Sequence, residues 1–254
     1  MKRIAMTMVA TLVLVYVGLC AALFFLQRSL MYFPQPASAV AGTKSMVLSI
    51  DDVNVQVTVR ASDGTKALLY FGGNGEDVNW SLGDLAVAFP DRSIYLMHYR
   101  SYGGSTGKPS ERALVADALS LFDEVHQHHD DVVVVGRSLG SGVAIQLGSQ
   151  RAVSRLVLVT PYDSVLNLAV RQFPYFPVRW LLLDKFESWR YAPAVTAPTL
   201  IIAAGDDEVI PRASTEALAA HFQAGVATLN VVAGAGHNSI SGPEYARMLA
   251  EAQP

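Results

Sequence analysis

Cysteine is almost absent from the chain, which contains one residue of this type, Cys20. A single cysteine cannot form an internal disulfide or a cysteine-based zinc site, so disulfide scaffolds and zinc fingers are excluded. Charged residues are also few, 16% of 254 residues, against about 25% in a typical soluble domain. The 19 basic and 22 acidic residues give a net charge of −3 and form no basic block, so no nucleic-acid partner is expected. A hydrophobic content of 51% excludes disorder.

The hydrophobic excess is concentrated at the N-terminus. Ile4–Leu26 contains no charged residue, and as a helix it would be about 35 Å long, enough for a bilayer core of about 30 Å. We expect one transmembrane helix, with an anchor over 1–28 and a neck over 29–44. The alternatives are a cleaved signal peptide, a lipoprotein signal and a buried core helix. The run is longer than the apolar core of a signal peptide, and Leu19 before Cys20 is not the small residue of a lipoprotein signal.

Basic residues flank this run unequally. Lys2 and Arg3 precede it together with the α-amino group, whereas Arg28 follows it. The positive-inside rule therefore predicts a cytoplasmic N-terminus and a globular domain on the non-cytoplasmic side, in a periplasm or a lumen.

Beyond the neck, extended apolar runs alternate with helical stretches, which is typical of an α/β fold. We expect one domain over 45–254, with a mostly parallel eight-stranded sheet and helices on both faces. Only Asp51 and Asp52 separate the first two strands, so these should form an antiparallel hairpin. The expected strands are Met46–Ile50, Val53–Arg60, Ala67–Phe71, Ser93–His98, Asp131–Val135, Leu156–Thr160, Thr199–Ala204 and Thr228–Val232. The expected helices are Val78–Ala88, Glu111–His128, Leu139–Ser149, Arg212–Phe222 and Pro243–Glu251.

The interval from Pro161 to Pro198 interrupts the alternation. We predict that it forms a small cap, inserted after the sixth strand over about 161–198; a packed surface helix is the alternative. Aromatic residues gather in it around Pro174 and Pro177: Phe173, Tyr175, Phe176, Trp180, Phe186, Trp189 and Tyr191.

The sequence Gly136-Arg137-Ser138-Leu139-Gly140 follows a run of four valines and precedes a helical stretch. A G-x-S-x-G motif in a strand-turn-helix setting is typical of a nucleophile elbow, in which the glycines permit a strained turn that exposes the serine. Ser138 is therefore the candidate nucleophile. A second match, Gly103–Gly107, runs into Lys108-Pro109, which cannot open a helix, so we interpret it as a loop.

A serine nucleophile needs a base and a carboxylate that orients it, in the chain order Ser, acid, His on α/β-hydrolase sheets. One expected strand ends in Gly205-Asp206-Asp207, and the last one ends in Gly234-Ala235-Gly236-His237. Both loops leave the carboxyl ends of strands, where ligands bind in open α/β sheets. We expect His237 to be the base and one of the two aspartates to be the acid.

The other histidines have weaker claims to a function. His126, His128 and His129 lie near a helix end beside two aspartates, where a solvated cap is favoured over a metal site. His98 falls on an interior strand and His221 near a helix end, and neither has a partner in the sequence.

Five motifs in this order resemble the α/β-hydrolase superfamily, and in particular its small membrane-tethered branch of serine hydrolases, often labelled serine aminopeptidase-like. The resemblance covers about Ser45 to the C-terminus. The sequence departs from the family pattern at Gly72, where the family has a histidine, and at Ser101, where it has a glycine. The motifs are Phe71–Glu76, Tyr99–Gly107, Gly136–Gly140, Gly205–Pro211 and Gly236-His237.

The resemblance implies an α/β-hydrolase fold and roles for particular residues. The family acid stands before one residue and an apolar pair that ends in proline, a spacing that Asp207 has and Asp206 lacks. The oxyanion would be held by the backbone N–H groups of Leu139 and, by family position, Asn74.

The residues and the resemblance together predict a serine hydrolase that cleaves an ester or thioester through an acyl-enzyme, with Ser138, His237 and Asp207 as its triad. No cofactor and no metal are expected. The substrate would be a small-molecule or lipid-like acyl compound, and the membrane is the other expected partner. A serine aminopeptidase is the alternative within enzymes, and it would need acidic groups from the cap: Asp163, Asp184 and Glu187. A catalytically silent tethered scaffold is the alternative from another class.

Overall fold

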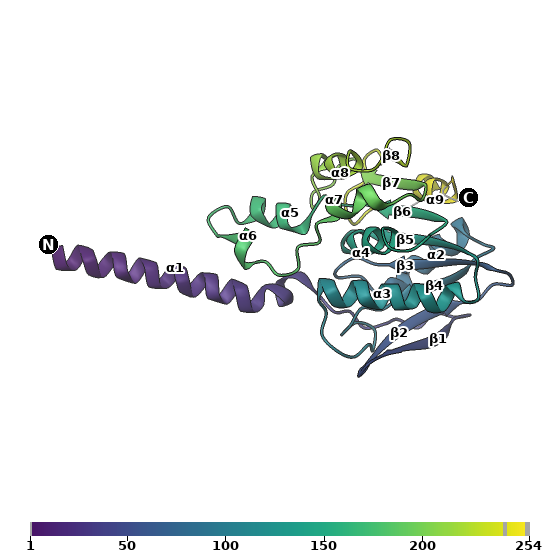
Figure 1. The fold of residues 1–254 in the computed structure, drawn as a ribbon, viewed down its shortest axis with the longest axis horizontal. Helices are drawn as coiled ribbons and strands as arrows, with labels where there is room; N and C mark the ends of the chain where they lie inside the picture. Colours follow the sequence, from purple (N-terminus) through teal and green to yellow (C-terminus); the bar gives the residue numbers. More distant parts are fainter. Residues whose placement is uncertain (1, 241–242, 252–254) are drawn as a thin grey trace.

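An eight-stranded sheet lies at the centre of the computed structural model, which describes residues 2–240 and 243–251 (Figure 1). The strand order is β1-β2-β4-β3-β5-β6-β7-β8. The strands are β1 (Lys44–Ile50), β2 (Val53–Arg60), β3 (Lys66–Phe71), β4 (Ser93–Met97), β5 (Asp131–Arg137), β6 (Arg155–Val159), β7 (Thr199–Ala204) and β8 (Ala227–Val232).

The pairing is antiparallel at one edge and parallel elsewhere. The β1–β2 hairpin turns at Asp51, whose φ is 49°, and β2 pairs with β4 in the antiparallel sense. The pairs from β4 through β3 to β8 are parallel, so their carboxyl ends meet at one edge of the sheet. The central strands are buried on both faces, which explains their continuous apolar runs.

Helices cover both faces of the sheet, as the sequence predicts. On one face α3 (Glu111–His126), α4 (Leu139–Gly148) and α8 (Arg212–Ala219) contribute to one cluster of buried side chains. On the other face, α2 (Leu82–Ala88) and α9 (Pro243–Glu251) contribute to a second cluster. The expected mostly parallel, eight-stranded α/β-hydrolase sheet is confirmed.

The cap lies between β6 and β7. It consists of α5 (Val165–Gln172), α6 (Val178–Leu181), α7 (Ser188–Tyr191) and the 3₁₀ helix η2 (Ala192–Ala194). α7 packs on α4, while α5 and α6 reach away from the sheet toward the long N-terminal helix α1 (Lys2–Met31) (Figure 1).

Several expected helix ends differ from the structure. The expected helix at 78–88 is a 3₁₀ helix, η1 (Val78–Ser81), followed by α2, because the Asp77 side chain accepts from Asn79 N and begins a tight turn. α3 and α8 end before 128 and 222, because the next residues make three-residue turns, such as Phe222 N to Ala219 O. The strands agree within about two residues, as boundary assignments usually do.

α1 projects from the body and continues into the expected neck, ending at Met31 (Figure 1). None of its described residues is buried, which rules out the alternative of a buried core helix. By length and apolar composition, α1 is a candidate membrane span.

Candidate active site

Ser138 occupies the sharp turn between β5 and α4, with φ of 48° and ψ of −117°. A positive φ is unusual for a residue with a side chain and marks local strain. The glycines of the motif let the helix approach the sheet. A Cβ on Gly136 would lie 2.5 Å from the Gly140 carbonyl oxygen, and a Cβ on Gly140 would overlap the Phe71 carbonyl oxygen. The small residues therefore fold into the elbow that the motif predicts.

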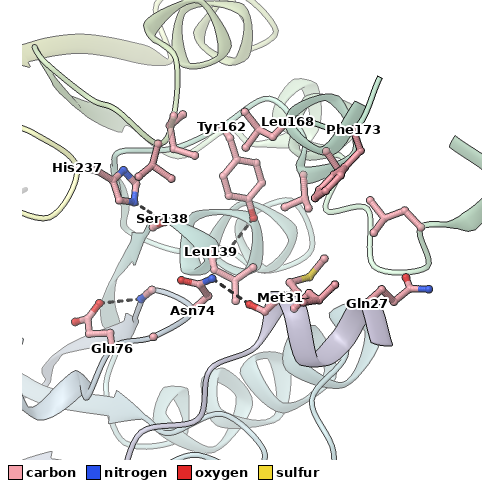
Figure 2. A pocket seen from close by; sticks show the side chains of 18 of the residues that line it. Gln27, Met31, Asn74, Glu76, Ser138, Leu139, Tyr162, Leu168, Phe173 and His237 are labelled. Carbon is pink, nitrogen blue, oxygen red and sulfur yellow. Dashed lines mark hydrogen bonds between the residues drawn. The ribbon is translucent and has the colours of Figure 1, made fainter. Parts of the chain in front are cut away.

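His237 and Asp207 approach Ser138 from the loops that follow β8 and β7 (Figure 2 shows the serine and the histidine). His237 Nε2 lies 2.9 Å from Ser138 Oγ, and His237 Nδ1 lies 2.9 Å from Asp207 Oδ2. The His237 and Asp207 side chains are both buried. Asp206, the other candidate acid, is exposed. The structure thus joins the hydroxyl, the imidazole and the carboxylate of three predicted site residues in one chain of contacts.

The environment of Asp207 keeps its carboxyl group ionised. Burial favours the neutral form, but hydrogen bonds from His237 and from the backbone N–H groups of Ile210 and Val209 outweigh it, so the pKa of Asp207 is lower than usual. An ionised carboxylate at Nδ1 favours a proton on that nitrogen. Nε2 is then free to accept the proton of the Ser138 hydroxyl.

Leu139 and Asn74, the expected oxyanion residues, both line the cavity beside Ser138 (Figure 2). Leu139 is the first residue of α4, where a backbone N–H has no partner within the helix. The Asn74 side chain donates to the Met31 carbonyl at 3.0 Å, which fixes the residue against the end of α1. Neither backbone N–H has a hydrogen-bond partner within residues 2–240 and 243–251. Both are therefore available to a ligand.

Glu76 belongs to the site, although the sequence analysis does not assign it a role. Its carboxylate accepts hydrogen bonds from the Gly73 backbone N–H at 2.8 Å and from the hydroxyls of Tyr70 and Ser81 at 2.6 Å each. It also lies 3.4 Å from an Arg137 guanidinium nitrogen. Because Glu76 accepts from the Gly73 N–H, the next backbone N–H of this loop, that of Asn74, is left without a partner among the described residues.

Arg137 links this loop to the histidine. One guanidinium nitrogen faces Glu76, and the other donates to the His237 carbonyl at 3.3 Å. Burial lowers the pKa of Arg137, but the nearby Tyr70 and Glu76 raise it above its usual value. Arg137 and Glu76 both lie inside motifs that the sequence analysis quotes. Their contact joins residues 61 positions apart, however, and spacing within a motif carries no signal for it.

A cavity of about 890 Å³ opens from Ser138 and His237 (Figure 2). Its size is within the range of pockets that hold drug-sized or lipid-like molecules. The walls away from the catalytic end are mostly apolar and come largely from the cap and from α1. The cap contributes Val165, Leu168, Phe173, Phe176, Val178, Leu181 and Leu182, and α1 contributes Leu23, Gln27, Leu30 and Met31. The sequence predicts α1 as an anchor, but it does not reveal that the end of this helix forms part of the pocket.

The other sequence candidates lie outside the site. Ser105, in the second G-x-S-x-G match, is a buried loop residue whose hydroxyl donates to the His98 carbonyl and accepts from the Gln56 backbone N–H, both at 2.8 Å. The interpretation of this match as a loop is confirmed. His129 contacts the Tyr95 hydroxyl at 3.0 Å. Within the described part of the chain, no cluster of three metal-ligating side chains is found.

Comparison with known proteins places this chain in a family. A family model described as serine hydrolase matches residues 115–242. An uncharacterized protein of Mycobacterium tuberculosis is 35% identical over 92% of this chain and 88% of its own length.

Two solved structures share the fold. An esterase of Pyrococcus furiosus matches with a TM-score of 0.69 at 14% identity, over 87% of this chain and 96% of its own. A membrane phospholipase A, described as a bacterial virulence factor, matches with a TM-score of 0.62 at 15% identity, over 93% of this chain and 92% of its own. The chain belongs to the serine hydrolase family, and it has the α/β-hydrolase fold.

Proposed function

We propose that the protein hydrolyses the ester of an apolar acyl chain, with Ser138 as nucleophile, His237 as general base and Asp207 as the residue that orients the histidine. The observation that carries this proposal is the unbroken series of contacts from hydroxyl to imidazole to carboxylate at the end of an apolar cavity. Such a series is how a serine hydroxyl is activated on α/β-hydrolase sheets.

In acylation, Ser138 Oγ attacks the ester carbonyl carbon while His237 Nε2 takes the hydroxyl proton. Asp207 stabilises the imidazolium, and the backbone N–H groups of Leu139 and Asn74 stabilise the negative oxygen of the tetrahedral intermediate. As the intermediate collapses, the carbon–oxygen bond to the alcohol breaks. His237 then gives its proton to the departing alcohol, and the acyl group stays on Ser138.

Deacylation repeats these steps with water. His237 takes a proton from the water, the hydroxide attacks the acyl carbonyl, and the proton returns to Ser138 as the carboxylic acid leaves. The same residues would cleave a thioester, whose thiol leaves in place of the alcohol. No step needs a cofactor.

The peptidase alternative is disfavoured by the cap acids, which would have to bind an amino terminus. Each of the three already has a hydrogen-bond or ion-pair partner in the chain. The partners are Asn167 and Ser214 for Asp163, Arg28 and Tyr32 for Asp184, and Arg190 for Glu187. The scaffold alternative gives no reason for a strained serine that faces a buried histidine.

The names of two proteins with this fold agree with an acyl substrate: one is an esterase and the other a membrane phospholipase A.

We also propose that the chain comprises an anchor (1–28), a neck (29–44) and a hydrolase domain (45–254) whose cap is 161–198.

The experiment that tests the function uses the purified full-length protein in detergent micelles. A fluorophosphonate probe should label Ser138, and Ser138→Ala should abolish both labelling and turnover, with a rate loss on the order of 10⁴ to 10⁶. Ser105→Ala is the matched control, because Ser105 lies in the same pattern but its hydroxyl bonds to backbone groups of His98 and Gln56 and not to an imidazole, and it should keep most of the turnover. Equal losses at both positions would show that the wrong serine is assigned.

A panel of p-nitrophenyl esters and matched thioesters from two to sixteen carbons then defines the acyl group. Burial of each methylene contributes about 0.8 kcal/mol, so kcat/KM should rise with chain length until the cavity is filled. A strict preference for acetyl would contradict the proposed apolar substrate. Cleavage of aminoacyl amides in preference to all esters would favour the peptidase.

A further inference from the structure

The outer part of the cap, residues 173–183, lies beside α1 and away from the sheet (Figure 1). We call this segment the cap tip. At its far end, the Tyr16 hydroxyl donates to the Tyr175 carbonyl at 2.9 Å, and the Tyr16 ring stacks on Phe176 with ring centres 5.9 Å apart. These contacts fix the end of the cap tip against the middle of α1.

The near end of the cap tip is tied to α1 by polar groups. The Gln27 side-chain amide donates to the Leu181 carbonyl at 3.1 Å, and its carbonyl accepts from the Leu183 backbone N–H at 2.7 Å. Immediately after these contacts, Arg28 pairs with the buried Asp184 at 3.0 Å. The ion pair among these contacts therefore lies at the end of the uncharged run of α1, where we expect the membrane surface.

The distance between the two sets of contacts along α1 can be compared with the thickness of a lipid leaflet. Tyr16 and Gln27 are eleven residues apart, which is about 16 Å along a helix. The hydrocarbon of one leaflet is about 15 Å deep, half of a bilayer core of about 30 Å. If α1 spans a bilayer, the cap tip runs through the same leaflet as the second half of α1.

The surface of the cap tip suits such a position. Tyr175 and Trp180 are 85% and 86% exposed, and Phe173 and Leu183 are also exposed. Large apolar side chains that remain exposed together mark a contact surface, and this one continues the bare apolar surface of α1. Tryptophan is enriched where a membrane meets water, and Trp180 lies next to Leu181, which Gln27 contacts at the near end of the cap tip.

The cap tip and the helix α5 before it carry only positive charge. From Ser164 to Leu183 there is no acidic residue, whereas Arg171 and Arg179 are both exposed. Arginine side chains are long enough to keep their guanidinium groups among lipid phosphates while their stems lie in the apolar layer. A lipid leaflet fits both the apolar and the charged features of this surface.

We infer that the cap tip inserts into the leaflet that holds the second half of α1, so that the pocket opens within the membrane. The inference rests on the proposed anchor and deepens the proposed function. The walls formed by Leu23 and Leu30 of α1 and by Phe176 and Leu181 of the cap then face lipid chains directly. The substrate class is a lipid ester that resides in the leaflet and whose acyl chain passes between α1 and the cap to Ser138.

Insertion is measured by labelling single cysteines of the full chain in phosphatidylcholine–phosphatidylglycerol vesicles. The label NBD is placed at Trp180→Cys in a Cys20→Ser background, and lipids with a doxyl group on the acyl chain serve as quenchers. Asp63→Cys in the same background is the matched control, because Asp63 is exposed in the loop before β3, at the opposite edge of the sheet from Ser138. The native Cys20, on α1, reports whether the anchor itself is in the bilayer.

The expected result is quenching at positions 20 and 180 and none at 63. Quenching at 20 with none at 180 would overturn the insertion of the cap tip while leaving the anchor intact. No quenching at 20 or at 180 would overturn the anchor and the inference that depends on it. Neither result depends on hydrolysis, so a failure of the proposed activity is detected separately.

A second measurement links insertion to the substrate. Tyr175→Ser/Trp180→Ser should reduce hydrolysis of a long-chain ester held in vesicles at least tenfold. It should leave kcat/KM for a short water-soluble ester unchanged, because neither residue lines the pocket. Val87→Ser, which alters an exposed apolar residue of α2, should change neither activity. If the double variant lost activity equally on both esters, or kept full activity on both, the proposed entry of the substrate from the leaflet would be contradicted.

Discussion

Ser138 has a strained backbone, and its hydroxyl is also the group that contacts His237. A residue in a sparsely populated backbone region persists only where the surroundings hold it there. Here the turn is held because the Ser138 N–H donates to the Val159 carbonyl and its own carbonyl accepts from the Ser141 hydroxyl. The serine is thus positioned before any substrate arrives.

Asp207 and Asp206 are neighbours with different environments, and this difference gives a prediction. Asp207→Asn should lower the maximal rate by about 10⁴, because an amide at Nδ1 no longer favours the tautomer that accepts the Ser138 proton. Asp206→Asn should lower kcat less than about tenfold, because the Asp206 side chain is exposed and does not contact His237 or Ser138. The measurement is kcat for both variants on one ester at one pH, with folding checked by circular dichroism. An inactive Asp206→Asn beside a normal Asp207→Asn would reassign the acid.

Glu76 gives a second prediction at the residue scale. Glu76→Gln keeps an acceptor for the hydroxyls but places an amide group where the carboxylate now meets the Gly73 N–H and Arg137. We expect the loop to shift and kcat to fall on the order of 10- to 100-fold, less than the loss of a complete oxyanion donor. KM should change less than about threefold, because the loop acts on the transition state.

The control for this variant is Glu216→Gln, which removes a charge from an exposed pair with Arg212. This variant should keep wild-type kcat and KM, since exposed ion pairs contribute little. A rise in KM at constant kcat for Glu76→Gln would show that the loop binds substrate and does not position the oxyanion amide.

At the scale of elements, the site depends on α4, which follows Ser138. Two glycines of α4 differ in how closely they approach the sheet, and this difference gives a prediction. Gly140→Ala should lower the free energy of unfolding by about 2 kcal/mol or more, because the new Cβ overlaps the Phe71 carbonyl and the helix has to move. Gly148→Ala, in the same helix, meets only ordinary contacts at 3.7 Å or more, and its effect should stay within about 1 kcal/mol. Denaturant titration of both variants measures the difference. Equal stabilities would show that a Cβ at Gly140 does not hinder the approach of α4 to the sheet.

The elements could largely be predicted from the sequence, because apolar runs and breaks are local signals. The buried run in β5 and the turn at Asp51 are of this kind. The position of β4 between β2 and β3 could not be predicted in this way, because the sequence of a strand does not specify which strand pairs with it. Ser138 and His237 stand in recognisable motifs, so the sequence could place them near one another.

Other parts of the candidate site depend on contacts between distant segments. The pairing of Glu76 with Arg137 and the closure of the pocket by α1 appear only when the chain is folded. The apolar sequence of a helix predicts an anchor, but it does not indicate whether the end of that helix also lines a pocket. The sequence therefore predicted which side chains meet beside Ser138 better than it predicted the walls of the pocket.

At the scale of the whole molecule, α1 and the cap tip form one continuous projection from the hydrolase body (Figure 1). Contacts at Tyr16 and Gln27 join them along its length, and Arg28 pairs with Asp184 just beyond the cap tip. Removal of α1 as a signal peptide would open the pocket on the side of Leu23 and Leu30. This arrangement favours an anchor that stays attached over a cleaved signal.

The last prediction concerns the membrane and the side on which the body lies. The protein should sediment with membranes, resist extraction by alkaline carbonate and retain an N-terminal epitope tag, because the apolar α1 remains in the bilayer. We expect Lys2 and Arg3 to keep the N-terminus in the cytoplasm, because Arg28 at the other end of the helix is paired with Asp184 and presents a reduced net charge. A protease added to intact cells with a permeable outer layer should therefore digest the hydrolase body, and a cytoplasmic marker protein in the same cells should stay intact. Full protection of the body would reverse the orientation, and release by carbonate would remove the anchor.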